Sequence, residues 1–289
     1  MLWFSSLWRQ VKQHLVTILV IAAILAVAIA LIIVGYRFDW TGFNGNNKSS
    51  KTLWDWLQLI FIPAVLTLGA IWYTARQNHD LQITRDNQRE TMLQTYLDKM
   101  SELLLHENLR TSKRGDDVRN IAHARTLTVL PQLDPNRKRS VILFLARSEL
   151  ITRDKWIIDM SFADLSGVDL SQAMMIDATA LDGTNLQGAN LSGAELSNVE
   201  LQGANLYRAN LSGTELWKAN MGEANLNRAN LSGANLREAN LGKADLTGAN
   251  LMRTFLAEAN LKGAKVSYQQ LKQAKSLKGA TMPDGSIHD

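Results

Sequence analysis

A five-residue repeat runs without interruption from Leu186 to Val266, and it limits how this chain can fold more than any other feature. Leucine occupies 15 of the 17 central positions, and alanine occupies 13 of the positions two residues earlier. Successive leucines would be rotated by about 140° on an α-helix and would change sides on a flat strand. The chain must therefore turn once per repeat, with the leucine and alanine inside and the other three residues outside.

The consensus of this repeat, A-(N/D)-L-x-x, resembles that of the pentapeptide-repeat family. One unit reads Ala189-Asn190-Leu191-Ser192-Gly193, and the resemblance extends from about residue 162 to residue 285. It implies a right-handed quadrilateral β-helix in which four repeats form one coil. The helical region followed by repeats also resembles cyanobacterial members of the family. The inward leucines predict a structural core that includes Leu206, Leu211, Leu226, Leu231 and Leu236.

The two ends of the repeat region are less regular. Upstream, Leu165, Leu170 and Met175 keep the five-residue spacing, but the step from Ala180-Leu181 to Leu186 requires one extra residue, which predicts a bulge or irregular corner near 180–183. The pair at 157–158 is expected to start the first coil. Downstream, residues 268–274 resemble the short helix that covers the open end of such a stack. We expect 277–282 to form a last edge strand.

The N-terminal region predicts a membrane hairpin. Residues 15–34 contain no charge and are long enough to cross the ~30 Å hydrocarbon layer. Residues 56–73 form a second apolar run with aromatic residues at both ends. A cleaved signal peptide ending near 26–28 is the alternative for the first run. With two spans, we expect an integral membrane protein of a bacterial plasma or thylakoid membrane, with both termini cytoplasmic.

Neither expected span contains an ionisable residue, which favours an anchor over a transport path. Small residues at Ala22, Ala26 and Ala30 form a stripe where a second helix could pack closely. That helix could be the second span or belong to another copy in a homo-oligomer.

The middle region predicts helices. Residues 74–110 lack proline and glycine and carry an apolar seam at Leu93, Leu97, Met100 and Leu104. Two shorter helices are expected at 118–130 and 136–150, the second capped by Asp134. The basic run at 137–139 is interpreted as a solvated helix start, in preference to a lipid or partner site.

The fold class is therefore α + β, with two transmembrane helices, a small helical linker domain and the β-helix. The expected domains are a membrane hairpin at 1–75, a helical juxtamembrane region at 76–155, repeats at 156–266, and a C-terminal cap and tail at 267–289.

Composition argues against an enzyme. The chain has no cysteine, and its five histidines lie far apart in sequence. The outward repeat positions hold no acid/base pair, nucleophile with a base, or phosphate loop. We therefore expect no catalytic, cofactor-binding or metal-binding residues.

The leading hypothesis is a scaffold that presents its β-helix to a partner protein. If residues 20 apart stack on one face, Trp217 lies beside Arg237, and Lys218 lies beside Glu238. An exposed Trp next to an Arg can form a cation–π pair and an interaction hot spot. The alternative is that Trp217 only covers a neighbouring side chain, since single exposed aromatic residues are common. Tyr207 is the second candidate.

Two other functions remain as alternatives. A DNA mimic that regulates topoisomerase needs a strongly negative rod, but residues 160–266 carry 11 acidic against 8 basic residues. We therefore expect no nucleic-acid partner. A subunit of an oligomeric transport or channel assembly would need a pore between copies, and the uncharged spans do not favour one. The expected partners are a protein and membrane lipid.

Overall fold

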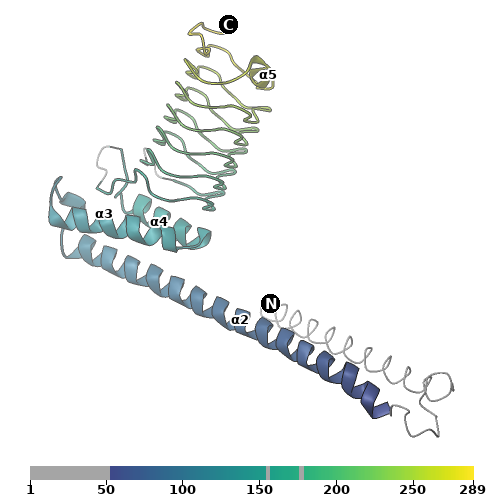
Figure 1. Cartoon of the computed structure of the whole chain (residues 1–289). Coiled ribbons are helices and arrows are strands. Elements are labelled where there is room, and N and C mark those ends of the chain that lie inside the picture. Colours follow the sequence, from purple (N-terminus) through teal and green to yellow (C-terminus); the bar gives the residue numbers. More distant parts are fainter. Residues whose placement is uncertain (1–52, 154–156, 176–178) are drawn as a thin grey trace, which may run out of the picture. The chain divides into compact units, whose positions relative to one another are not determined.

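The computed structural model describes residues 53–153, 157–175 and 179–289, and the side chains of these residues from Pro63 onward. The chain divides into two compact units, of which the first ends at Gln82 and the second covers Ile83–Asp289. Figure 1 shows the helices and the coil of repeats.

Helix α2 covers Leu53–Leu105 and begins in the first unit. It includes the second expected span, 56–73, whose side chains are described only from Pro63. The first expected span, 15–34, lies outside the described residues. Among the described residues, no helix has an apolar stretch long enough to cross a membrane. The helix ends five residues before Arg110, where the sequence placed its end.

The second unit begins with a small helical layer. After α2 come η2 (Leu109–Thr111), α3 (Asp117–Val129), η3 (Leu130–Gln132) and α4 (Pro135–Arg147). Helices α3 and α4 lie within three residues of the ranges predicted for them. The side chain of Asp134 caps α4 by accepting hydrogen bonds from the backbone N–H groups of Asn136 and Arg137.

One face of α2 packs into this layer. Leu93 and Met100 of the predicted seam are buried, while Leu97 and Leu104 are half-buried. The structure adds Tyr96, whose hydroxyl group lies 2.9 Å from the Thr126 hydroxyl. Burial raises the pKa of the Tyr96 phenol, so the ring stays neutral in this core.

The repeats form a coil with four repeats per turn, as the family resemblance implied. Parallel bridges join residues 20 apart, for example Asn185 to Asn205 and Asn205 to Asn225. The backbone N–H of Leu186 donates to Asn205 O at 2.8 Å, and the N–H of Asn205 donates to Thr184 O at 2.9 Å. Each side of the coil is one repeat long, so bridges occur singly. The central leucines and their alanines are buried in one continuous column.

The extra residue lies upstream of the predicted bulge. Bridges from Asp164, Asp169 and Met174 reach residues 21 positions later, whereas Ala180 reaches a residue 20 positions later. The additional residue therefore falls between Met174 and Ala180, and not at 180–183. Gly183 occupies an ordinary corner with φ of 61°.

The sequence reasoning assumed that the residue before each leucine simply faces outward. In the structure its side chain also bonds along the coil. These residues form ladders in which each side-chain amide donates to the residue one coil earlier. Asn205 Nδ2 donates to Asn185 Oδ1 at 3.0 Å, and Asn225 Nδ2 donates to Asn205 Oδ1 at 3.0 Å. Every ladder runs toward the N-terminal end and stops on a carboxylate. These carboxylates belong to Asp164, Asp169, Glu200 and Glu215.

Helix α4 covers the N-terminal edge of the coil. Carbonyl groups of the first coil have no earlier coil to bond, and basic side chains of α4 bind several of them. Lys138 Nζ lies 3.1 Å from Asp164 Oδ2 and 3.4 Å from Ser166 O. Arg139 Nη1 donates to Asp169 O at 2.8 Å and Ser171 O at 3.1 Å. The edge is thereby protected from pairing with other strands.

This arrangement corrects the solvated reading of the basic run at 137–139. Arg137 binds back to α2, with Nη1 2.8 Å from Asp86 Oδ1 and Nε 2.9 Å from Glu90 Oε2. Lys138 is 4% exposed. The three cations therefore join α2, α4 and the first coil. Sequence alone could not show that a carbonyl edge lies opposite them.

The C-terminal end is closed by the expected short helix, α5 (Tyr268–Leu271). Ser267 and Gln270 form a capping box at its start. The Gln270 amide also donates to the carbonyl groups of Leu246 and Ala249, at 2.7 and 2.9 Å. These bonds tie the cap to the coil beneath it.

Candidate interaction surface

Trp217, Lys218 and Glu238 form one cluster on a side of the coil, here called the Trp217 cluster. The Lys218 ammonium lies 4.2 Å from the centre of the Trp217 ring, and the indole Nε1 donates to Glu238 Oε1 at 3.0 Å. Lys218 and Glu238 form an ion pair of 3.4 Å. Trp217 is 37% exposed. The hydrogen bond from the Trp217 indole, aided by Lys218, lowers the pKa of the Glu238 carboxyl.

Arg237 does not stack on Trp217, which corrects the predicted cation–π pair. Its guanidinium lies 4.3 Å from the centre of the Phe255 ring, and Lys275 lies 4.6 Å from the same ring. Side chains at these corners reach forward to the following coil, so Trp217 meets Glu238 and Arg237 meets Phe255. The sequence reasoning assumed that residues 20 apart in one column contact each other. It did not anticipate that the side chains of Trp217 and Arg237 extend to residues of neighbouring columns.

Phe255 is a surface residue that the sequence reasoning missed. It takes the ladder position that Asn235 fills one coil earlier in the same column. The replacement of an amide side chain by Phe255 at this position was the signal in the sequence that could have revealed it. Phe255 has no amide to donate, and Arg237 Nη1 lies 3.3 Å from Asn235 Oδ1 instead.

Tyr207 is not part of this surface. It lies two repeats before Trp217, which is half of a four-repeat coil, so the two side chains project from opposite sides. Tyr207 is half-buried, and the Arg208 guanidinium lies 5.1 Å from its ring centre. The predicted site residues therefore separate into the Trp217 cluster, Arg237 with Phe255, and Tyr207 alone.

The five predicted core leucines, by contrast, lie together inside the coil. None of them has measurable exposure to solvent. They are Leu206, Leu211, Leu226, Leu231 and Leu236.

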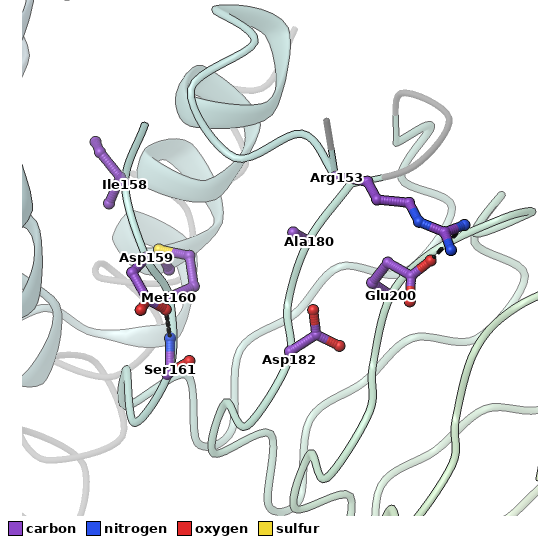
Figure 2. A pocket seen from close by; sticks show the side chains of 8 residues that line it. All are labelled: Arg153, Ile158, Asp159, Met160, Ser161, Ala180, Asp182 and Glu200. Atoms are coloured by element: carbon purple, nitrogen blue, oxygen red, sulfur yellow. Dashed lines mark hydrogen bonds and ion pairs between the residues drawn. The ribbon is translucent and has the colours of Figure 1, made fainter. Parts of the chain in front are cut away.

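A pocket of about 340 Å³ opens near the first coils, where Arg153, Asp182 and Glu200 line it (Figure 2). Glu200 is bound by Arg153 at 2.9 Å and by the Asn220 amide at 2.7 Å. Burial raises the pKa of the Asp182 carboxyl, although that carboxyl accepts the Gln202 N–H at 2.8 Å. These carboxylates are engaged by the protein itself. Among the described residues, no cluster of three or more His, Asp or Glu could hold a metal ion.

A family model described as pentapeptide repeats matches the chain in eight copies, over residues 177–213, 204–242, 229–267 and 239–275. Among curated proteins, no sequence matches the chain. Matching solved structures include HetL from the cyanobacterium Nostoc sp. strain PCC 7120, a pentapeptide repeat protein involved in regulating heterocyst differentiation. HetL is 38% identical over 45% of this chain and 65% of its own, just under two thirds, with a TM-score of 0.32.

A second match is Rfr23, a pentapeptide repeat protein from the cyanobacterium Cyanothece 51142. It is 34% identical over 36% of this chain and 67% of its own, with a TM-score of 0.31. A pentapeptide repeat protein of the Arabidopsis thaliana thylakoid lumen is 25% identical over 45% of this chain and 83% of its own, with a TM-score of 0.23. On its uninterrupted repeats, the match of the repeat model and its identity to Rfr23, this chain belongs to the pentapeptide-repeat family.

Proposed function

We infer that this chain is an interaction scaffold whose β-helix presents the Trp217 cluster to a partner protein. The observation that carries this proposal is the state of the Trp217 side chain. Its ring is partly exposed, yet Lys218 covers one part of it and Glu238 holds its N–H. Tryptophan is among the residues most enriched at binding hot spots. A ring that is already ordered loses less entropy when a partner binds.

The backbone beneath the cluster supports the same proposal. Trp217 O accepts the N–H of Asn198 at 2.8 Å, and the N–H of Lys218 donates to Arg237 O at 3.0 Å. Leu216, the centre of the same repeat, is fully buried. The cluster therefore stands on a continuous core and on bonds to the coils on either side. Such a support favours a fixed binding surface over a mobile loop.

The charges of this side favour a protein partner over the DNA-mimic alternative. Mimicry of DNA needs one sign of charge along the whole rod. Here Lys218 and Glu238 follow one another in a single column, and Arg237 lies beside Glu238. A protein surface can match alternating signs, and such complementarity gives specificity.

The proposal also includes membrane attachment through the apolar segments 15–34 and 56–73. Support comes from their length, their lack of charge and the aromatic residues that flank the second segment. Attachment would hold the β-helix beside a membrane, with both termini on the cytoplasmic side. Membrane lipid is then the second partner of the scaffold.

A capture experiment tests the scaffold role. The tagged full chain, extracted from native cells in a nonionic detergent, is compared with Trp217→Ala and with Tyr207→Ala as the matched aromatic control on the opposite side. We expect Trp217→Ala to lose a co-purifying protein that wild type and Tyr207→Ala retain, at equal melting temperatures. Identical sets of captured proteins from wild type and Trp217→Ala would show the proposal to be wrong.

A further inference from the structure

Helices α2 and α3 share an open groove of about 530 Å³, here called the α2–α3 groove. The hydroxyl groups of Tyr96 and Thr126, 2.9 Å apart, join the two helices. Tyr96 lies nine residues before the end of α2, and Thr126 lies nine residues after the start of α3. The two helices therefore form an antiparallel hairpin, and the groove runs along it.

The α2–α3 groove is lined mainly by apolar surface. Met92 of α2 is 39% exposed, and Ile121 of α3 is 45% exposed. Ala124 and Val129 also line the groove. Single exposed apolar residues are ordinary, whereas apolar residues that gather in a groove mark an interaction site. The groove therefore has the character of an interface that one chain leaves open.

Two charges of opposite sign stand on opposite rims of the α2–α3 groove. Arg125 lines it from α3. Asp98 follows the lining residue Thr95 by three positions, so it stands on the same side of α2. Both charged side chains are exposed, and neither forms an ion pair with another described residue. The nearby Glu102 is already held by Lys99, whose hydrogen bond lowers the pKa of the Glu102 carboxyl.

We propose that the α2–α3 groove binds the same groove of a second copy of this chain. A two-fold axis along the groove places α2 of one copy against α3 of the other, as in a four-helix bundle. Arg125 directly precedes Thr126, and Asp98 follows Tyr96 by two residues. The bond between Tyr96 and Thr126 therefore sets both charges at nearly the same height along the hairpin. Arg125 of each copy then faces Asp98 of the other.

Self-complementarity favours a second copy over an unrelated helix. Each groove carries one unpaired charge of each sign, and they stand on different helices, so a two-fold contact forms two ion pairs at once. An unrelated helix would need an acid and a base at matched positions on its two flanks. Association also removes Met92 and Ile121 of both copies from water, which favours binding. This contact uses the helical layer and no residue of the Trp217 cluster, so it goes beyond the scaffold role.

Introduced cysteines test the contact, because the chain has none of its own. Full-length Asp98→Cys and Arg125→Cys chains are mixed in a nonionic detergent, left to exchange and oxidised. We expect at least fivefold more disulfide-linked dimer than in a mixture of Asp98→Cys with Arg147→Cys, a control at an exposed position of α4. Each variant oxidised alone should likewise give at least fivefold less. Equal yields in the two mixtures would overturn the proposal.

Charge exchange gives a second, independent measurement by analytical ultracentrifugation of the full chain in the same detergent. We expect Asp98→Arg to halve the protein mass of the wild-type dimer, and Asp98→Arg combined with Arg125→Asp to restore it, at equal melting temperatures. A dimer that Asp98→Arg leaves intact would overturn the proposal and assign association to another surface, such as the apolar segment 15–34. A monomeric wild type would also overturn it, and a captured protein lost by Ile121→Glu would then assign the groove to a different partner.

Discussion

The indole N–H of Trp217 donates a hydrogen bond of 3.0 Å to Glu238, which lies 21 residues later and one coil further along. Lys218 approaches the same ring and also pairs with Glu238. The three side chains restrain one another. A partner would meet a tryptophan whose orientation is set before binding.

This restraint predicts different effects for two changes at Glu238. Glu238→Ala removes the indole acceptor and the partner of Lys218, so we expect several-fold weaker capture of the protein partner. Glu238→Gln keeps a carbonyl oxygen for the indole and should retain most of the capture. Quantified pull-downs at equal amounts of bait measure both. Similar losses for the two variants would mean that charge at Glu238, and not ring orientation, controls binding.

Packing inside the coil predicts a large effect at Leu231. Its side chain is fully buried in the middle of the stack, so Leu231→Ala leaves a cavity that costs about 2 to 5 kcal/mol. Asn227→Ala, at a half-buried outer position one repeat earlier, should cost less than about 1 kcal/mol. Chemical denaturation of the full chain in a nonionic detergent measures both. Comparable losses would contradict the division into inward and outward positions.

The direction of the amide ladders predicts that an aspartate in the middle of a ladder costs more than one at the N-terminal end, where the ladder stops on a carboxylate. Asn210 Nδ2 donates to Asn190 Oδ1 at 3.1 Å. Asn210→Asp sets one acceptor against another, which should cost about 1 to 3 kcal/mol. At the end of the same ladder, Asp169→Asn keeps the acceptor for the Asn190 amide and should cost less than about 1 kcal/mol. Thermal unfolding compares the stabilities of the two variants. A greater loss of stability for Asp169→Asn than for Asn210→Asp would contradict the assigned direction of the ladder.

The contacts of α4 predict that Lys138 stabilises the N-terminal edge. Lys138→Ala leaves the Asp164 carboxylate and the Ser166 carbonyl without this donor. We expect a loss of about 1 to 3 kcal/mol, because Asp164 keeps part of its solvation. Arg147→Ala, at an exposed position of the same helix, is the control and should stay within about 0.5 kcal/mol of wild type. Denaturation curves that superimpose for the two variants would exclude this role.

The proposed hairpin makes a topological prediction. The chain contains no cysteine, so a single introduced thiol reports its own side of a membrane. We expect Ser49→Cys and Ser286→Cys to react with an impermeant maleimide from opposite sides of sealed vesicles. Labelling from the same side would contradict two spans, and full recovery of the chain in the soluble fraction would contradict membrane attachment.

Sequence reasoning succeeded where one residue type had one environment. Each central leucine sits in the same column of apolar neighbours, so its burial follows from the repeat. The four-repeat coil followed from the family resemblance and was confirmed. The extra residue was misplaced because the hydrophobic spacing shows that the count changes between Met175 and Leu186, but not at which bond the chain absorbs the change.

The contacts between coils were harder to predict, because they depend on where long side chains lean. Column arithmetic placed Arg237 beside Trp217, but Arg237 extends to Phe255. Likewise, a basic run at the start of a helix looks the same whether it faces water or the open edge of a coil. Lys138 and Arg139 face the edge, and only the arrangement of α4 and the first coil reveals it.

A coil of four repeats also determines how such a chain could lengthen. Inserting 20 residues adds one complete coil, so each column of stacked residues continues on the same side beyond the insertion. Inserting five residues would rotate everything beyond the insertion by a quarter turn relative to α4. Trp217 would then project over a neighbouring side, still folded but aimed elsewhere. This architecture can therefore lengthen or shorten by whole coils without moving its surfaces. Adding or removing a single repeat would turn the Trp217 cluster to another side without unfolding the β-helix.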